Sequence, residues 1–599
     1  MNNIENVYSN RIEKFTSLSR LIKKRIDFIS NMRFLVFAVV VIADIFLYRS
    51  GNALPMIPVT LSGLVFFVAL VIYHESLYRR LNHYKNLLVI NNRCIKRFND
   101  QWNDFRDNGE DFTDREHSFT ADLDIFGPDS LFQWICSANT FSGRKALARV
   151  LASFPDDITS IHKRQAAISE ISSLIDFRQN LQADSINECA NRDDEPMLYW
   201  LESDEYLFKN KTVFFILTVL PWITNIAGIT AFLLKAPGIA TLIYTFNFLL
   251  SILWRGKIMK VMDAFEKRSP VLSTYSQAIK RILSESFNSE LLIRLHDTFI
   301  RKKGDSAFDA LKRMASLVNS SHVRYSGLGS FIFNMLFIWD LQCLLRMERW
   351  KRQNGKEVRK WIVALGEIEM LSTLSQIRFE NPDWCFPAID PDHNHVSAKK
   401  LGHPLLWNKK RVCNDFTASD KSVSIITGSN MSGKTTFLRT VGINYVLAFA
   451  GAPVCAETFS CCPVNLYTSM RIHDDLRANV SSFFAELIRV KKIVDAISSG
   501  ERVFFLLDEL FRGTNSRDRH DGAVAVLNVL ISGGASGLIS THDLELAVLE
   551  TDFPGKFKNL HFSERITESN ITFDYHLHDG PSDSRNALAM IRLAGIPIV

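Results

Sequence analysis

One short stretch, GSNMSGKTTFLRT at residues 428–440, restricts the fold more than any other part of this 599-residue chain. It follows the apolar run SVSIIT and contains Gly428, four intervening residues and then Gly433, Lys434 and Thr435. Glycines so placed let backbone N–H groups curl around phosphate oxygens, and a helix that begins at Lys434 directs its positive end at them. The spacing therefore predicts a strand, a phosphate-binding loop and a helix, in that order.

In this interpretation the loop holds a nucleotide, with ATP and Mg²⁺ as the expected cofactors. Lys434 would reach the β and γ oxygens, and the hydroxyl of Thr435 would bind Mg²⁺. The expected nucleotide-binding residues are Gly428, Ser429, Asn430, Met431, Ser432, Gly433, Lys434, Thr435 and Thr436.

Two later apolar strands end in residues that suit phosphate chemistry. RVFFLLDE at 502–509 ends in Asp508 and Glu509, and GLISTH at 537–542 ends in His542. Asp508 would hold Mg²⁺ through water, and Glu509 would polarise the attacking water. His542 would sense the γ-phosphate or position that water. The expected catalytic residues are Glu509, His542 and Lys434, and the expected Mg²⁺ ligands are Thr435 and Asp508.

Each of these residues has a structural alternative. A carboxylate at a strand end can cap a turn, and a lone histidine after a strand can be a packing residue. The occurrence of all three strands in this order favours the nucleotide site.

ABC transporter ATPases are one competing class, because they also combine a phosphate loop with membrane segments. Their Ser-Gly-Gly signature precedes the acidic strand, whereas ISGGA at 531–535 follows Glu509 here. We interpret that string as the end of a helix, made by Gly533 and Gly534.

A different segment, MRIHDDLRANVSSFFAELIRV at 470–490, precedes the acidic strand and resembles the MutS family of DNA mismatch-repair ATPases. LLDELFRGTNSRD at 506–518, STHDLEL at 540–546 and the tail at 577–597 are similar to that family, as is the Asn-Met pair inside the loop. The resemblance extends upstream, so that it covers about 122–599, with the second apolar pair at 212–254 inserted. The residues that follow the family pattern in the first segment are Asp474, Asp475, Ser481, Ser482, Phe483 and Glu486.

The resemblance implies an ABC-like α/β P-loop ATPase domain of MutS domain V type, joined to an all-α core and lever. It also implies a homodimer in which Ser481 and Ser482 contact the γ-phosphate of the partner's site. The same two serines could instead cap the helix FFAELIRV, and both roles can coexist.

Four apolar segments form two pairs, at 34–48 with 53–73 and at 212–234 with 236–254. Each pair predicts a helical hairpin of about bilayer-spanning length, with a tight turn on the far side. Lysines and arginines flank both hairpins, which places the termini and the remaining chain in the cytoplasm. The alternative is that these are buried helices of a large soluble core. Asp44 is expected to face its partner helix or to lie near the interface, although an intramembrane carboxylate is also a functional candidate.

Composition sets wider limits. A net charge of +6 permits nucleic-acid binding without arguing for it. The nine cysteines show no paired CxxC spacing, and we expect reduced thiols in a cytosolic setting. No cleavable signal peptide is recognisable at the start of the chain.

The pattern between the hairpins and the phosphate loop is mainly helical. The interrupted apolar run at 331–345 predicts one buried helix of a soluble bundle. The predicted organisation is a basic cytosolic segment at 1–33, a membrane hairpin at 34–73, a linker helix at 74–121, a MutS-like helical core at 122–400 with a hairpin at 212–254, and the ATPase domain at 401–599.

The sequence also departs from the family pattern. We expect no mismatch-reading domain before residue 122, a short or missing DNA clamp, and no helix-turn-helix tail. The expected function is a multi-pass, inner-membrane MutS-type ATPase switch that acts in DNA mismatch repair or binds related DNA structures. Its expected partners are a second copy, double-stranded DNA and the lipid bilayer. A membrane-tethered switch that acts on a protein without DNA is the alternative, and a transporter is a weaker one.

Overall fold

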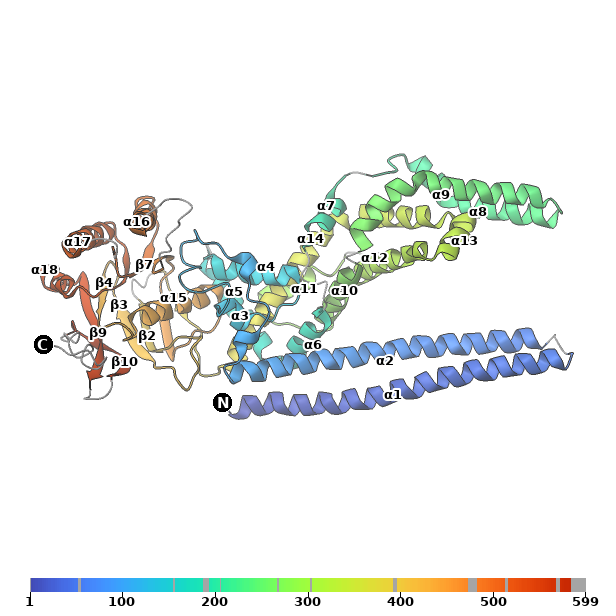
Figure 1. Cartoon of the computed structure of the whole chain (residues 1–599). Coiled ribbons are helices and arrows are strands. Elements are labelled where there is room, and N and C mark those ends of the chain that lie inside the picture. The colour runs from blue at the N-terminus through green and yellow to red at the C-terminus, as the bar shows by residue number, and fades with distance from the viewer. Residues whose placement is uncertain are drawn as a thin grey trace.

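The computed structural model describes residues 2–51, 55–154, 157–186, 193–204, 206–266, 269–301, 304–391, 396–471, 482–511, 515–566 and 571–582. The molecule is elongated (Figure 1). An α/β domain containing the C-terminal elements lies at one end, and a long helical body extends from it. One helical hairpin runs alongside the body and a second projects from its far end, and both turn at the end remote from the α/β domain.

The first hairpin consists of α1 (Asn2–Arg49) and α2 (Met56–Phe98). Its turn-proximal half is apolar and exposed, with Phe34 and Phe46 more than 70% accessible. Its other half packs on the body through a small core of Phe15, Leu87 and Ala183.

The linker helix predicted for 74–121 ends early, because α2 stops at Phe98. Asp100 takes a left-handed conformation with φ of 58°, which a continuing helix does not allow. Two short 3-10 turns, Trp102–Asp104 and Glu110–Phe112, follow in its place.

The second hairpin consists of α8 (Lys211–Leu233) and α9 (Pro237–Glu266). Asn210 starts it, since its side chain accepts a hydrogen bond from Thr212 N. Lys235 makes the turn with a φ of 57°. By length and composition, α1, α2, α8 and α9 are each long and apolar enough to cross a membrane.

Asp44 faces α2, as expected, and its Oδ2 accepts a 2.8 Å hydrogen bond from Thr60 Oγ1. A carboxylate bonded to the neighbouring helix is the arrangement expected for an acidic side chain among apolar residues.

The helical body is organised around α14, a helix of 42 residues that packs against α4, α5, α9 and α12. The C-terminal end of α14 reaches the α/β domain (Figure 1). The helices of the body are α3 (Leu131–Ile135), α4 (Phe141–Ala152), α5 (Ile158–Ser173), α6 (Ile175–Ser185), α7 (Glu195–Glu202), α10 (Ser269–Leu283), α11 (Glu290–Asp297), α12 (Ala307–Ser321), the 3-10 turn His322–Tyr325, α13 (Gly327–Phe337) and α14 (Trp339–Glu380).

The single buried helix predicted for 331–345 is wrong. Ile338 has a φ of 50°, and the chain bends there by 72° between α13 and α14. Asn334 produces the break, because its side-chain Oδ1 accepts from Asp340 N while its Nδ2 donates to Asp340 Oδ2. Most of the apolar side chains of α13 are exposed.

The α/β domain contains a six-stranded sheet in the order β10-β9-β4-β8-β7-β6, parallel except for β10. A smaller sheet has the order β1-β5-β2-β3. The strands are β1 (Ala388–Ile389), β2 (Val396–Leu401), β3 (Asn414–Ala418), β4 (Val423–Thr427), β5 (Thr458–Cys461), β6 (Asn465–Ser469), β7 (Val503–Asp508), β8 (Ser536–Ser540), β9 (Phe557–Ile566) and β10 (Ile571–Asp579).

Two different cores cover this sheet. α15 (Lys434–Ala450) is buried along nearly its whole length, and it belongs to the same apolar core as the helical body. α16 (Ser482–Ser498) and α17 (Ser516–Ser532) contribute to a second core on the sheet. The remaining helical turns are Leu544–Val548 and α18 (Leu549–Asp552). As predicted from ISGGA, α17 ends where Gly533 and the left-handed Gly534 follow.

Candidate nucleotide site and its link to the helical body

The glycine-rich loop follows β4, a fully buried strand between two parallel neighbours. Gly428 and Gly433 have φ values of +143° and +108°, which side-chain-bearing residues rarely adopt. A Cβ atom on Gly428 would lie 2.9 Å from the carbonyl oxygen of Phe562. The backbone conformation therefore requires the glycines that the sequence provides.

The loop presents hydrogen-bond donors toward the space above α15. α15 begins at Lys434, and its N-cap Gly433 has no side chain that could cover the first N–H groups. The Ser429 and Ser432 hydroxyls are buried, and no partner is found for either within the described part of the chain. Uncapped N–H groups, two unpaired hydroxyls and a buried lysine suit an anionic phosphate.

Lys434 is 5% exposed, and its ammonium group lies inside the loop. Nζ donates 2.8 Å hydrogen bonds to the carbonyl oxygens of Gly428 and Ser429. His542 Nε2 lies 3.4 Å from the same nitrogen. The loop thus holds the ammonium group of Lys434, which the sequence predicts to contact phosphate oxygens.

Thr435 and Asp508 meet although 73 residues separate them. Thr435 Oγ1 donates to Asp508 Oδ2 at 2.8 Å, and Ser540 Oγ donates to the other carboxylate oxygen. A hydroxyl beside a carboxylate offers the hard oxygen ligands that Mg²⁺ prefers. Sequence reasoning missed Ser540, although it ends a strand parallel and adjacent to the one that carries Asp508.

Glu509 and His542 come together at the ends of β7 and β8. His542 Nε2 lies 2.9 Å from Glu509 Oε1 and 2.8 Å from Asn430 Oδ1. Glu509 has a φ of 51°, a strained conformation for a residue with a side chain, and its N–H donates to Ser540 O at 2.9 Å. Three predicted site residues from three segments therefore form one contact group.

The remaining predicted residues lie at the edge of this group. Met431 also has a positive φ, and its side chain is 85% exposed. Thr436 is exposed in the first turn of α15. Ser481 lies outside the described residues, as do Asp474 and Asp475. Ser482 begins α16, and its side chain is likewise outside the description.

A cavity of about 720 Å³ opens beside Glu509 and His542. The start of α17 and the segment after β8 line it, and His520 Nδ1 contacts Asp543 Oδ2 there at 2.8 Å. Space for a bulky ligand is thus present next to the predicted catalytic residues.

Asp122, like Ser540, has a structural role that the sequence did not predict. It is 3% exposed and accepts hydrogen bonds from Thr468 Oγ1, Met470 N and Arg489. Thr468 lies in β6 and Arg489 in α16. A carboxylate at the start of the helical region therefore fixes the sheet edge and α16.

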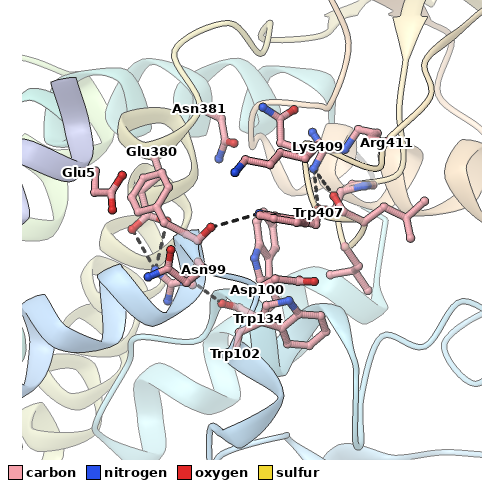
Figure 2. Close-up of a pocket in the computed structure, with 16 residues that line it drawn as sticks. Glu5, Asn99, Asp100, Trp102, Trp134, Glu380, Asn381, Trp407, Lys409 and Arg411 are labelled. Atoms are coloured by element: carbon pink, nitrogen blue, oxygen red, sulfur yellow. Dashed lines mark hydrogen bonds and ion pairs between the residues drawn. The ribbon is translucent and has the colours of Figure 1, made fainter. Parts of the chain in front are cut away.

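A separate cavity of about 260 Å³ lies where the first hairpin, α14 and the α/β domain meet. Figure 2 shows Trp102, Trp134 and Trp407 at this cavity, with Lys409 and Arg411 on its α/β side. Trp407 Nε1 donates to the carbonyl oxygen of Phe98, the last residue of α2, at 3.3 Å. This contact joins the α/β domain to the first hairpin.

A buried ion pair forms the floor of this cavity. Arg97 Nη1 lies 2.9 Å from Glu380 Oε1, and their side chains are only 5% and 6% exposed. Tyr8 of α1 donates to the same carboxylate, and burial raises the pKa of its phenol well above the usual range. The carboxylate at the end of α14 thus binds both helices of the first hairpin.

The nucleotide loop and this cavity are connected through α15. Asn444 Nδ2 donates to Gly402 O at 3.0 Å, and its Oδ1 accepts from Cys455 N. Gly402 immediately precedes the segment that carries Trp407. The helix that begins at the loop therefore also holds the segment that contacts α2.

Known proteins are similar to this chain in the region that contains the α/β domain. The family model described as MutS domain V matches residues 424–599. The chain is 30% identical over 241 residues to the DNA mismatch repair protein MutS of Natronomonas pharaonis, covering 39% of this chain and 27% of that protein. It is 31% identical over 301 residues to the DNA mismatch repair protein MutS of Thermotoga petrophila, covering 49% and 38% respectively. The matches therefore span well under half of these relatives.

The parallel sheet, its glycine-rich loop and the polar strand ends define an α/β domain with a site suited to a phosphate-bearing ligand. Residues 424–599 match MutS domain V, so this part of the chain is of MutS type.

Proposed function

We propose that the protein is a membrane-anchored ATP hydrolase of MutS type that works as a dimeric switch in DNA mismatch repair or related DNA-structure binding. The observation that carries the proposal is the convergence of Lys434, Thr435, Asp508, Glu509 and His542 beside one glycine-rich loop. Five residue types suited to phosphoryl chemistry, drawn from three strand ends, meet at one place.

Each residue has a defined part. Lys434 balances the charge of the β and γ oxygens, and the N–H groups of the α15 start bind the phosphates. Thr435 and Asp508 would hold Mg²⁺, which when bound neutralises charge on the phosphates. Glu509 takes the proton of the attacking water, and His542 holds the Glu509 carboxylate in position.

The similarity to MutS proteins supports the dimer and the DNA partner. The relatives in the comparison are named DNA mismatch repair proteins. Ser481 and Ser482 would complete the site of the partner subunit across the dimer interface. The ATPase domain would comprise residues 401–599, and the helical core residues 122–400.

The hairpins would anchor the protein in the inner membrane. Four helices have sufficient apolar length, and the turns of both hairpins point in the same direction. Basic residues flank the ends that face the body, which supports a cytoplasmic position for the ATPase domain.

One experiment tests the activity. ATP hydrolysis by the full chain in detergent is measured alone and with homoduplex, mismatched and branched DNA, with Glu509→Gln as the catalytic control. Hydrolysis that depends on Glu509 and is stimulated by DNA supports the proposal. Hydrolysis that survives in the variant refutes the assigned role of Glu509, and indifference to every DNA refutes the DNA partner.

A further inference from the structure

A short apolar helix, α13, lies against the second hairpin and not inside the helical body. Its residues Leu328, Phe331, Ile332 and Phe333 are 73%, 47%, 42% and 39% exposed. The ring of Phe331 packs on Phe248 of α9, with 5.1 Å between ring centroids. α13 has eleven residues, and four of them are large, exposed apolar side chains. A helix in contact with water normally exposes less apolar surface.

Polar side chains of the hairpin tie α13 to the hairpin's apolar part. Asn225 Nδ2 donates to Leu336 O at 2.7 Å, and Asn247 Nδ2 donates to Met335 O at 3.1 Å. Asn225 lies in α8 at a distance of roughly 21 Å along the helix from Lys211, at 1.5 Å per residue. α13 therefore sits beside the apolar stretch of the hairpin, beyond its basic flank.

The geometry of α13 excludes a full crossing. Eleven residues span roughly 16 Å, about half the hydrocarbon thickness. The chain then turns by 72° at Ile338 and returns along α8, where Gln342 Nε2 donates to Leu217 O. The polar groups at the bend satisfy one another, since Asn334 bonds Asp340 through both backbone and side chain. A segment that enters and returns with its bend internally hydrogen-bonded can lie in a bilayer.

A basic groove lies between α12 and α14. It is a cavity of about 770 Å³ whose charged side chains are Arg301, Arg313, Arg346, Arg349 and a single carboxylate, Asp305. Asp305 pairs with Arg301 and Arg313.

The other two arginines of the groove have no carboxylate partner in the described ranges. Arg346 lies over the ring of Trp339 at 5.7 Å, and Arg349 lies over Phe214 in the first turn of α8 at 5.5 Å. The groove is therefore level with the start of the hairpin, where headgroups would be.

We propose that α13 is a re-entrant segment of the cytoplasmic leaflet, with its exposed apolar face against acyl chains, and that the adjoining arginine groove binds the phosphate of an anionic phospholipid. The inference rests on the proposed membrane anchoring by α8 and α9. Charge complementarity and continuity with the hairpin's apolar surface favour lipid over other anions.

The first test measures lipid contact position by position. The full chain is placed in lipid nanodiscs with dansylalanine at Leu328, at Ile226 on α8, or at Val529 on α17, and nitroxide-labelled lipid is the quencher. Quenching at 328 and 226 but not at 529 is the expected result. Quenching at 226 alone refutes the inference and leaves the anchor intact, whereas no quenching at 226 refutes the anchoring itself.

The second test addresses the groove. Quenching at 328 by headgroup-labelled phosphatidylglycerol should exceed that by labelled phosphatidylcholine at least twofold. Arg346→Gln with Arg349→Gln should remove the excess, whereas the matched control Lys356→Gln with Lys360→Gln, on the same helix, should keep it. Equal quenching by the two lipids refutes the headgroup site. Loss of duplex DNA binding in the arginine variant, with lipid quenching unchanged, would assign the groove to DNA instead.

Discussion

His542 Nε2 lies 2.9 Å from Glu509 Oε1, and the two residues occupy the carboxyl ends of adjacent parallel strands. The backbone of Glu509 is left-handed, with a φ of 51°. The proposed proton acceptor and the residue proposed to orient it thus form a pair whose members can be tested separately.

Glu509→Gln should reduce ATP turnover by roughly 10²- to 10³-fold, because the amide cannot accept the proton of water. ATP affinity should change little, as Glu509 is not among the phosphate donors. Steady-state hydrolysis and nucleotide-binding fluorescence measure the two quantities. Glu545→Gln, a nearby exposed carboxylate, is the control, and an equal loss in both variants would contradict the prediction.

His542→Ala should lower turnover by about 10²-fold, because a misplaced catalytic group costs about that much. Turnover should stay above that of Glu509→Gln, since the carboxylate remains. Combining the two substitutions should cost no more than Glu509→Gln alone. Fully multiplicative losses in a double-mutant cycle would show that the two side chains act independently.

Thr435→Val should raise the Mg²⁺ concentration needed for half-maximal hydrolysis by at least tenfold. Valine keeps the side-chain shape and removes the oxygen that would bind the ion beside Asp508. Titration of hydrolysis with Mg²⁺ measures the shift. Thr435→Ser should restore normal dependence, and a valine variant with unaltered Mg²⁺ dependence would exclude Thr435 as a ligand.

Glu380→Ala should destabilise the junction between the first hairpin and α14. The substitution leaves Arg97 buried without its carboxylate, which typically costs about 3–5 kcal/mol. Thermal unfolding in detergent should show a clearly lower Tm. Glu195→Ala, which breaks an exposed pair with Arg359, should change the Tm far less, and similar losses in both variants would contradict this assignment.

The protein should lose stability as the pH falls below about 6.5. Removal of the His403 imidazole from water, with Arg439 and Arg411 nearby, lowers its pKa to about 3. Between about pH 6.5 and 3 the unfolded chain binds a proton there that the folded chain does not, so stability falls by about 1.4 kcal/mol per pH unit.

His403→Gln should remove this contribution. The Tm of the glutamine variant should therefore decline less between pH 7.5 and 5.5 than that of the unmodified protein. An identical decline in both proteins would show that His403 is not responsible.

Local patterns in the sequence correctly predicted the strand, glycine-rich loop and helix of residues 423–450. The spacing around Gly428 and Gly433 specifies the backbone by itself, and the strands ending at Asp508 and Ser540 are short apolar runs with few alternatives. The contacts of Ser540 could not be predicted, because they depend on which strands become neighbours in the sheet.

Long-range packing explains the other differences. The bend at Ile338 depends on a hydrogen-bonded pair, Asn334 and Asp340, that apolar periodicity does not register. Phe98, at the end of α2, likewise contacts Trp407, a residue 309 positions away. Roles for Ser481 and Ser482 across a dimer remain predictions.

The unbroken helix α14 has a mechanical consequence. Its 42 residues form a stiff rod of roughly 63 Å that begins beside the second hairpin and ends at Glu380, next to the segment held by α15. A rotation of about 5° at the Glu380 end would carry the opposite end through about 5 Å, the rise of one helical turn. Small rearrangements around a bound nucleotide would thereby reach the end of α14 beside the second hairpin. The resulting displacement would be large enough to shift one helix by a full turn against another.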